Sequence, residues 1–224
     1  MKTKQSGFTL VEIAIVLVII GLLLGGILKG QEMITQAKIK NVVNDFNGIT
    51  AAMNSYQDRY RALPGDDVNA AGRWSGSVSG NGDGQFGTPA GTAGGANTYS
   101  KILSAAPVAG EETNLFWWHL RLAGFVGGVT AGAGAGNPPA NAANGLMGVQ
   151  TTGLSFTANI VCSSNLPDKI AIAVDTQMDD GTALSGQVRA TLQTGPNPAV
   201  PATSSAADVY AETGTNQYLL CKTL

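Results

Sequence analysis

The hydrophobic positions of the first 60 residues follow two successive patterns. From Phe8 to Leu28 the chain is almost continuously apolar over 21 residues, and Glu12 is the one ionisable side chain among them. At about 1.5 Å of rise per residue, a helix of this length crosses the roughly 30 Å hydrocarbon core of a bilayer. Beyond Lys29, apolar residues recur at steps of three and four, which is one face of a helix: Ile39, Val42, Phe46, Ile49, Met53, Tyr56 and Tyr60. We predict one helix from Phe8 to about Tyr60, ended by Pro64.

The periodic stripe allows two interpretations. Its three-four spacing fits a coiled-coil seam, but it also fits a helix face that packs against its own domain, and we favour the second. Within the apolar half, small residues repeat at four-residue spacing, which lets helices approach closely: Gly21 with Gly25, and Gly26 with Gly30.

The remainder of the chain, from residue 63 to 224, predicts a globular head with long glycine-rich loops. Short alternating segments indicate strands at 154–161, 186–194 and 216–222. A helix is expected within 111–125, with Thr113 or Asn114 as its cap and Gly124 at its end. The segment 167–178 fits a strand or a helix, and we favour the helix; 65–97 and 127–153 are expected to be loops. The predicted fold is α+β, with a small antiparallel sheet packed on the long helix.

Composition and motifs argue against an enzyme and against a nucleic-acid-binding protein. Only 12% of the 224 residues are charged and the formal net charge is -2, so no basic field attracts nucleic acid. The sequence has no nucleophile elbow, phosphate loop, dinucleotide fingerprint or HExxH motif. His119 is the only histidine, and we expect it to be a packing residue.

One short stretch partly matches a calcium loop. Asn81, Asp83 and Gln85 alternate with glycine like the first ligand positions of an EF-hand, but Phe86 and Thr92 stand where glycine and glutamate are needed. Simple Gly/Asn turns are therefore the favoured interpretation. A looser oxygen cage that includes Asp66 and Asp67, or one at Asp179 and Asp180, stays open. We expect no cofactor, with calcium as the one candidate.

Glu12 is the anomaly of the apolar segment, because a carboxylate near a membrane centre needs a partner. Lys2 and Lys4 lie too far before it for a one-turn contact, and Lys29 lies at the far end of the span. Gly7 followed by the letters FTLVE resembles the processing motif of type IV pilins and type II secretion pseudopilins. The resemblance implies cleavage between Gly7 and Phe8, methylation of the new N-terminus, and pairing of Glu12 with the Phe8 amine of a neighbouring subunit.

An ordinary secretory signal peptide fits the same segment less well. Its apolar region would be shorter and would end in an A-x-A-like site, whereas this run continues into Lys29, Gly30 and Gln31. We therefore predict a leader at 1–7, a transmembrane and assembly helix at 8–30, an amphipathic helix at 31–62 and the head at 63–224. Many pilins have a proline in the early helix; this chain has none before Pro64, which favours a pseudopilin or a minor pilin.

Lys2 and Lys4 place the start of the chain in the cytoplasm by the positive-inside bias, so the head faces the periplasm or the cell exterior. Cys162 and Cys221 would meet an oxidising compartment, where a disulfide can form; two free buried thiols are the alternative. The resemblance, in which a C-terminal disulfide is frequent, favours the bridge.

The function expected from the resemblance is that of a structural filament subunit. Its partners would be other copies of itself, the prepilin peptidase, an inner-membrane platform protein and an assembly ATPase. The alternative is a membrane-tethered periplasmic binding module that does not polymerise and is lectin-like through Trp117 and Trp118.

Overall fold

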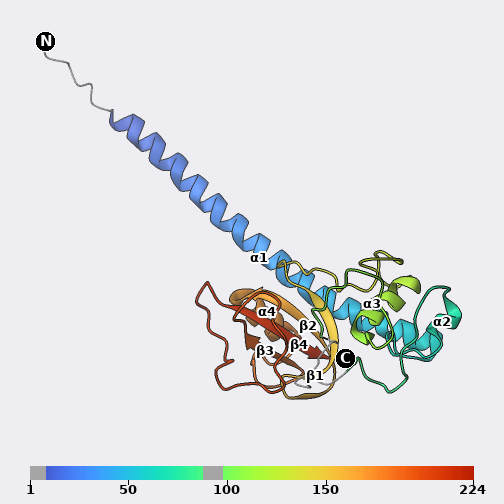
Figure 1. The fold of residues 1–224 in the computed structure, drawn as a ribbon. Coiled ribbons are helices and arrows are strands. Elements are labelled where there is room, and N and C mark those ends of the chain that lie inside the picture. The colour runs from blue at the N-terminus through green and yellow to red at the C-terminus, as the bar shows by residue number, and fades with distance from the viewer. Residues whose placement is uncertain (1–8, 88–97) are drawn as a thin grey trace, which may run out of the picture. The chain divides into compact units, whose positions relative to one another are not determined.

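The computed structural model describes residues 9–87 and 98–224 (Figure 1). Its elements confirm an α+β fold with a long N-terminal helix. The helices are α1 (Leu10–Tyr60), α2 (Ala70–Arg73), α3 (Glu112–Leu122) and α4 (Asp168–Met178), and the strands are β1 (Met147–Gly153), β2 (Phe156–Pro167), β3 (Val188–Leu192) and β4 (Gln217–Thr223). By its contacts the chain divides into two units, the first ending at Lys38 and the second running from Ile39 to Leu224.

The α1 residues of the second unit form part of the hydrophobic core. The predicted stripe is buried from Ile39 to Tyr56, and its side chains pack in one cluster with Trp117 and Leu120 of α3 and with residues of the sheet. Tyr60 is partly buried against the same cluster. The stripe therefore packs on its own domain, as favoured over a coiled-coil seam.

The four strands form one antiparallel sheet in the order β1-β2-β4-β3. β2 and β4 are its two central strands, and Cys162 lies directly opposite Cys221 in their register. The two cysteines form a disulfide with a Cα–Cα distance of 4.0 Å, buried beside Leu154 and Leu219. The disulfide confirms the bridge and excludes the two free thiols.

The prediction of a loop over 127–153 is wrong at its C-terminal end, because β1 occupies Met147–Gly153. β1 and β2 are joined by Leu154 and Ser155, which have φ values of 49° and 62°. Two central residues with positive φ are typical of a type I′ hairpin turn, where Asn-Gly is the common sequence. The Leu-Ser sequence is not typical of such a turn. The predicted strand therefore included Leu154, and β1 was not predicted.

The helix α3 lies where it was predicted, but it is not capped as expected. Its N-cap residue is Glu111, with no side-chain capping bond, and Thr113 and Asn114 lie inside the helix. The Asn114 amide instead donates to the carbonyl oxygens of Lys101 and Gly136, both at 2.9 Å, and so ties two loops to α3. The structure also confirms a helix, α4, for the ambiguous segment after Pro167.

Candidate functional site

The start of α1 is held by three reciprocal hydrogen bonds between Thr9 and Glu12. The Thr9 backbone N–H and hydroxyl both donate to Glu12 Oε2 at 2.8 Å, and the Glu12 N–H donates to Thr9 Oγ1 at 3.3 Å. This is a capping box, which satisfies backbone donors that the first helical turn leaves unpaired. Glu12 therefore has a partner within its own chain that is not a cation, and Thr9-x-x-Glu12 is the sequence signature of this motif.

The apolar side chains of the first unit contact almost nothing within the chain. From Leu10, which is 91% exposed, to Leu28, the large hydrophobic residues of α1 are exposed. A Cβ atom added at Gly21, Gly25, Gly26 or Gly30 would meet no atom within 4 Å. Among the described residues, α1 is the one helix long and apolar enough to cross a membrane.

The comparison with protein families matches this same segment. The family described as Prokaryotic N-terminal methylation motif matches residues 2–28. The segment is a type IV pilin and pseudopilin signature. No curated protein matches the sequence at a significant level.

The methylation motif, together with the apolar helix, fits a membrane-anchored protein of the type IV pilin-like or pseudopilin kind that prepilin peptidase processes. Gly7 and Phe8, the predicted processing positions, lie outside the described residues. Glu12 lies in the first turn of α1, three residues after Thr9.

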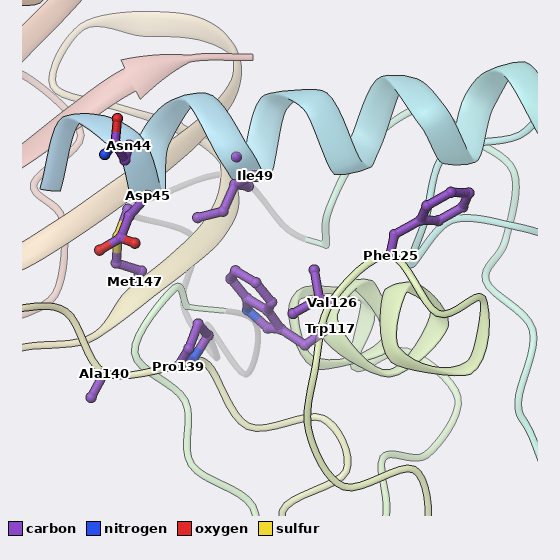
Figure 2. A pocket seen from close by; sticks show the side chains of 10 residues that line it. Asn44, Asp45, Ile49, Trp117, Phe125, Val126, Pro139, Ala140 and Met147 are labelled. Atoms are coloured by element: carbon purple, nitrogen blue, oxygen red, sulfur yellow. The ribbon is translucent and has the colours of Figure 1, made fainter. Parts of the chain in front are cut away.

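Trp117 and Trp118 do not form an exposed platform, so the interpretation of a lectin-like stacking surface is wrong. Trp117 is 1% exposed and Trp118 is 4% exposed, because α3 is covered on several sides. The Trp118 indole donates to the Thr130 carbonyl at 2.8 Å. The Trp117 indole N–H has no hydrogen-bond partner among residues 9–87 and 98–224, and the ring lines a pocket in the second unit (Figure 2).

His119 is buried, and both of its ring nitrogens are occupied. Nδ1 accepts the Gly65 N–H at 3.0 Å, and Nε2 lies 2.8 Å from the Val78 carbonyl, to which it donates in the tautomer that these partners require. Burial lowers the pKa of His119, because the charged ring would be poorly solvated there. His119 therefore holds the loop that follows α1 against α3.

Next to His119, the loop after α1 is held by a charged network. Asp67 is fully buried, accepts the Tyr56 hydroxyl at 2.7 Å and forms an ion pair with Arg73. Asp67 thus takes no part in the calcium cage that was considered for it, since its carboxylate is occupied by a phenol and a guanidinium.

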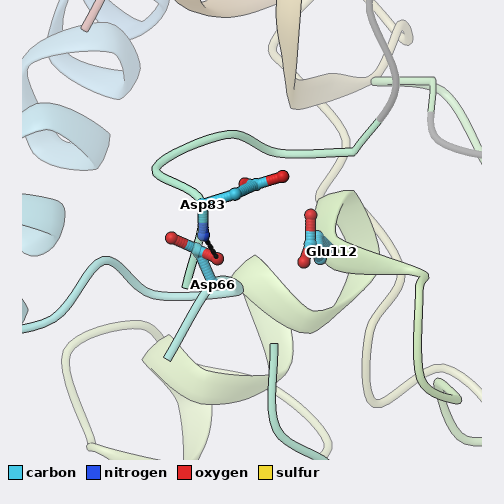
Figure 3. Close-up of side chains that lie close together, drawn as sticks. All are labelled: Asp66, Asp83 and Glu112. Atoms are coloured by element: carbon cyan, nitrogen blue, oxygen red, sulfur yellow. Dashed lines mark hydrogen bonds between the residues drawn. The ribbon is translucent and has the colours of Figure 1, made fainter. Parts of the chain in front are cut away.

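Asp66 lies in a different cluster, with Asp83 and Glu112 (Figure 3). One oxygen of each carboxylate lies within 4.8 Å of the others, and Asp66 and Glu112 are buried. Sequence reasoning missed Glu112 because the loop that contains Asp83 meets α3 only through the fold. Burial, as the largest effect, and the neighbouring Asp83 and Asp66 raise the pKa of the Glu112 carboxyl.

The loop over residues 81–87 is wrapped around the Asp66 and Glu112 carboxylates. Asp66 accepts backbone N–H groups from Gly82, Asp83 and Gly84 at 2.5 to 3.1 Å. Glu112 accepts those of Asn81 at 3.2 Å and Gly87 at 2.8 Å. The Glu112 bonds hold the loop to α3, and the Asp66 bonds hold it to the segment that follows α1.

Within that loop the side-chain oxygens of the predicted calcium ligands Asn81 and Asp83 accept backbone N–H groups of the next predicted ligands. Asp83 donates its N–H to the Asn81 side chain at 2.8 Å, and Gln85 donates its N–H to the Asp83 side chain at 2.9 Å. Such Asx turns are the favoured interpretation of this stretch. Calcium binding stays a prediction.

A second acidic cluster joins Asp179 and Asp180 to Asp175, which the sequence did not point to. Asp175 is fully buried and accepts the Tyr210 hydroxyl at 2.6 Å. Asp180 accepts the Thr182 N–H at 2.8 Å and the hydroxyl of Ser185 at 2.6 Å. These bonds order the turn between α4 and β3.

Proposed function

We propose that this protein is a subunit of a type IV pilus-like filament or a type II secretion pseudopilus. It would be stored in the inner membrane, cut between Gly7 and Phe8, methylated at Phe8 and assembled through α1. The observation that carries the proposal is the methylation motif at residues 2–28, which includes the start of α1, where the large apolar side chains from Leu10 to Leu28 are exposed among the described residues.

The exposure of those side chains supports assembly on physical grounds. Each apolar side chain that leaves water contributes roughly 1.5 to 3 kcal/mol, so a helix with this many exposed apolar residues requires lipid or other helices around it. Stored subunits would use lipid, and assembled subunits would use the same helix of neighbouring copies. The four glycines at which an added Cβ would meet no described atom within 4 Å would allow close approach of those helices.

The geometry at Glu12 supports its proposed role in setting the register between neighbours. Both Thr9 bonds go to Oε2, and Oε1 accepts no hydrogen bond from any described residue. The α-amino group created at Phe8 by cleavage would be a cation, since its reference pKa is about 7.7 to 8.0. Glu12 Oε1 of one subunit would then accept the Phe8 amine of the next.

The proposed partners follow from the resemblance to type IV pilins and type II secretion pseudopilins. They are the prepilin peptidase, an inner-membrane platform protein, an assembly ATPase and further copies of the chain. Lys2 and Lys4 support a single pass with a cytoplasmic start. The absence of proline before Pro64 favours a pseudopilin or a minor pilin over a major pilin.

Processing is tested by the intact mass of the protein purified from its native membrane. We expect a chain that begins at a methylated Phe8. A chain that still begins at Met1, or one cut beyond Leu28, would refute the proposal.

Assembly is tested by replacing Glu12, with Glu32→Ala as the matched control. Glu32 is an exposed acid of the same helix, which pairs with Lys29 at 2.8 Å. Glu12→Ala should be inserted and processed but should give at least about tenfold less sedimentable filament, since 1.4 kcal/mol per contact is a factor of ten. Glu32→Ala should assemble normally. Normal filaments from Glu12→Ala would refute the register role.

A further inference from the structure

The second unit contains a pocket of about 320 Å³ that the proposed assembly does not use (Figure 2). It is lined by α1 (Asp45 and Ile49), by Trp117 of α3, by the segment after α3 (Phe125), and by Met147 at the start of β1. A concave and mostly apolar pocket of a few hundred Å³, with few polar groups, is typical of small-molecule sites.

Asp45 is the charged group of this pocket, and it has no counter-ion. Its side chain is half-buried, and no lysine, arginine or histidine among residues 9–87 and 98–224 forms an ion pair with it. No described residue donates a hydrogen bond to it. Burial raises the pKa of Asp45, with no neighbouring donor to offset the cost. A partly desolvated carboxylate without a partner favours a cation.

The aromatic residues of the pocket fit the same ligand. Trp117 and Phe125 both line it, and aromatic faces attract ammonium groups. Ile49 and Met147 provide apolar surface for the body of a ligand.

We propose that this pocket binds a free small organic cation, in which an ammonium group on a compact apolar body pairs with Asp45. Charge complementarity selects the ammonium group, and the apolar lining selects its stem. The pocket is lined by residues of α1, α3, the segment after α3, Pro139 with Ala140, and β1. Its volume lies at the lower end of the range of ligand sites, so a compact free molecule fits it better than an extended peptide does. This site lies wholly within the second unit, whereas the exposed apolar side chains that support the proposed assembly lie in the first unit.

The test uses the full chain in a nonionic detergent, which does not concentrate cations, and two probes of nearly the same shape. These are 2-phenylethylammonium and its neutral counterpart 2-phenylethanol. Calorimetry should give an affinity at least about tenfold higher for the cation, and the Trp117 indole N–H signal in a ¹H–¹⁵N spectrum should shift on binding. A Trp117→Phe variant identifies that signal by its loss.

Asp45→Asn should remove the preference for the cation and leave the affinity for 2-phenylethanol unchanged. Asp58→Asn is the matched control, because Asp58 is an exposed acid of α1 that does not line the pocket. It should bind both probes as the wild type does. The wild-type comparison between the two probes decides the matter even if the Asp45 variant folds poorly.

Three outcomes would overturn the proposal. One is that neither probe binds at millimolar concentration, and another is that the wild type binds both equally. The third is a higher affinity for N-acetyl-lysine methylamide than for 2-phenylethylammonium, which would assign the pocket to a lysine side chain of another protein.

Discussion

The two parts of α1 use the same kinds of apolar residue in opposite ways. Before Lys38 the large hydrophobic side chains are exposed, from Leu10 at 91% to Leu28 at 67%. After Ile39 the apolar stripe is buried, and Val42, Phe46 and Tyr56 are each 0% exposed. One continuous helix therefore has a part that is satisfied inside the chain and a part that requires other molecules.

The difference shows what each arrangement of apolar residues achieves. A stripe at three-four spacing covers one face and leaves the other polar, so it can dock on a single domain. A segment that is apolar on all sides cannot be covered by one domain, and it requires lipid or several helices. The continuous apolar run ends near Lys29, and the transition between the two kinds of partner follows at Lys38 and Ile39.

The largest expected effect is the change in the free energy of unfolding when one apolar side chain is truncated in each part. Phe46→Ala should lower the free energy of unfolding of the second unit by about 3 to 5 kcal/mol, because it leaves a cavity in the core. Leu17→Ala, at a residue that is 63% exposed, should change it by less than about 0.5 kcal/mol. Urea unfolding of the full chain in detergent, followed by tryptophan fluorescence, measures both. Equal losses would show that the two parts do not differ.

Loss of the disulfide should lower the stability of the second unit alone. Replacing both Cys162 and Cys221 by alanine releases a link over a sequence separation of 59, and should cost about 4 kcal/mol in the chain-entropy model. Amide exchange of residues 10–38 should not change, because the bridge lies among residues of the sheet. Faster exchange in that first part would contradict the independence of the two units. The reduced wild type provides the control for effects of the alanines themselves.

Acid should destabilise the second unit through His119. Its pKa is lowered in the folded state, so the unfolded chain binds the proton more readily. The stabilising contribution is complete above the reference pKa of about 6.5 and is lost as the pH falls, by up to about 1.4 kcal/mol per pH unit, until the lowered pKa is reached. Unfolding between pH 7.5 and pH 5 should show this slope.

His119→Gln is the control for this slope, since its amide can accept from Gly65 and donate to Val78 without titrating. The raised pKa of Glu112 acts in the opposite direction in both proteins, because a group whose pKa is raised on folding loses stability as the pH rises. The difference between the two proteins therefore isolates His119. An unchanged slope in His119→Gln would assign the pH dependence to other groups.

The smallest expected effect lies at the start of the first unit. Thr9→Val removes the side-chain half of the capping box and should cost about 1 kcal/mol, equivalent to about fivefold faster amide exchange at Glu12. Thr35→Val is the matched control, because the Thr35 hydroxyl bonds only to the Gln31 carbonyl of its own helix. An unchanged exchange rate at Glu12 would show that the Thr9 hydroxyl does not stabilise this turn.

Most elements of the fold could be predicted from the sequence because their signals are local. The long helix, α3, α4 and three of the strands follow from periodicity, from Gly124 and from Pro167. β1 could not be predicted, since Leu154 and Ser155 adopt positive φ without the residues that usually indicate it. The caps expected at Thr113 and Asn114 failed for a related reason, because loops distant in sequence compete for those side chains.

The sequence by itself determined the N-terminal segment: the methylation motif, the apolar run, the single acid at Glu12 and the position at which the apolar pattern changes. These depend on neighbours within a few residues, so a local pattern contains them. Only the tertiary structure decided that Asp67 pairs with Arg73 while Asp66 meets Glu112. It also decided that Asp45, which has no counter-ion among the described residues, lines the same pocket as Trp117. Those relations join residues far apart in the chain, and their energies depend on burial that no local pattern shows.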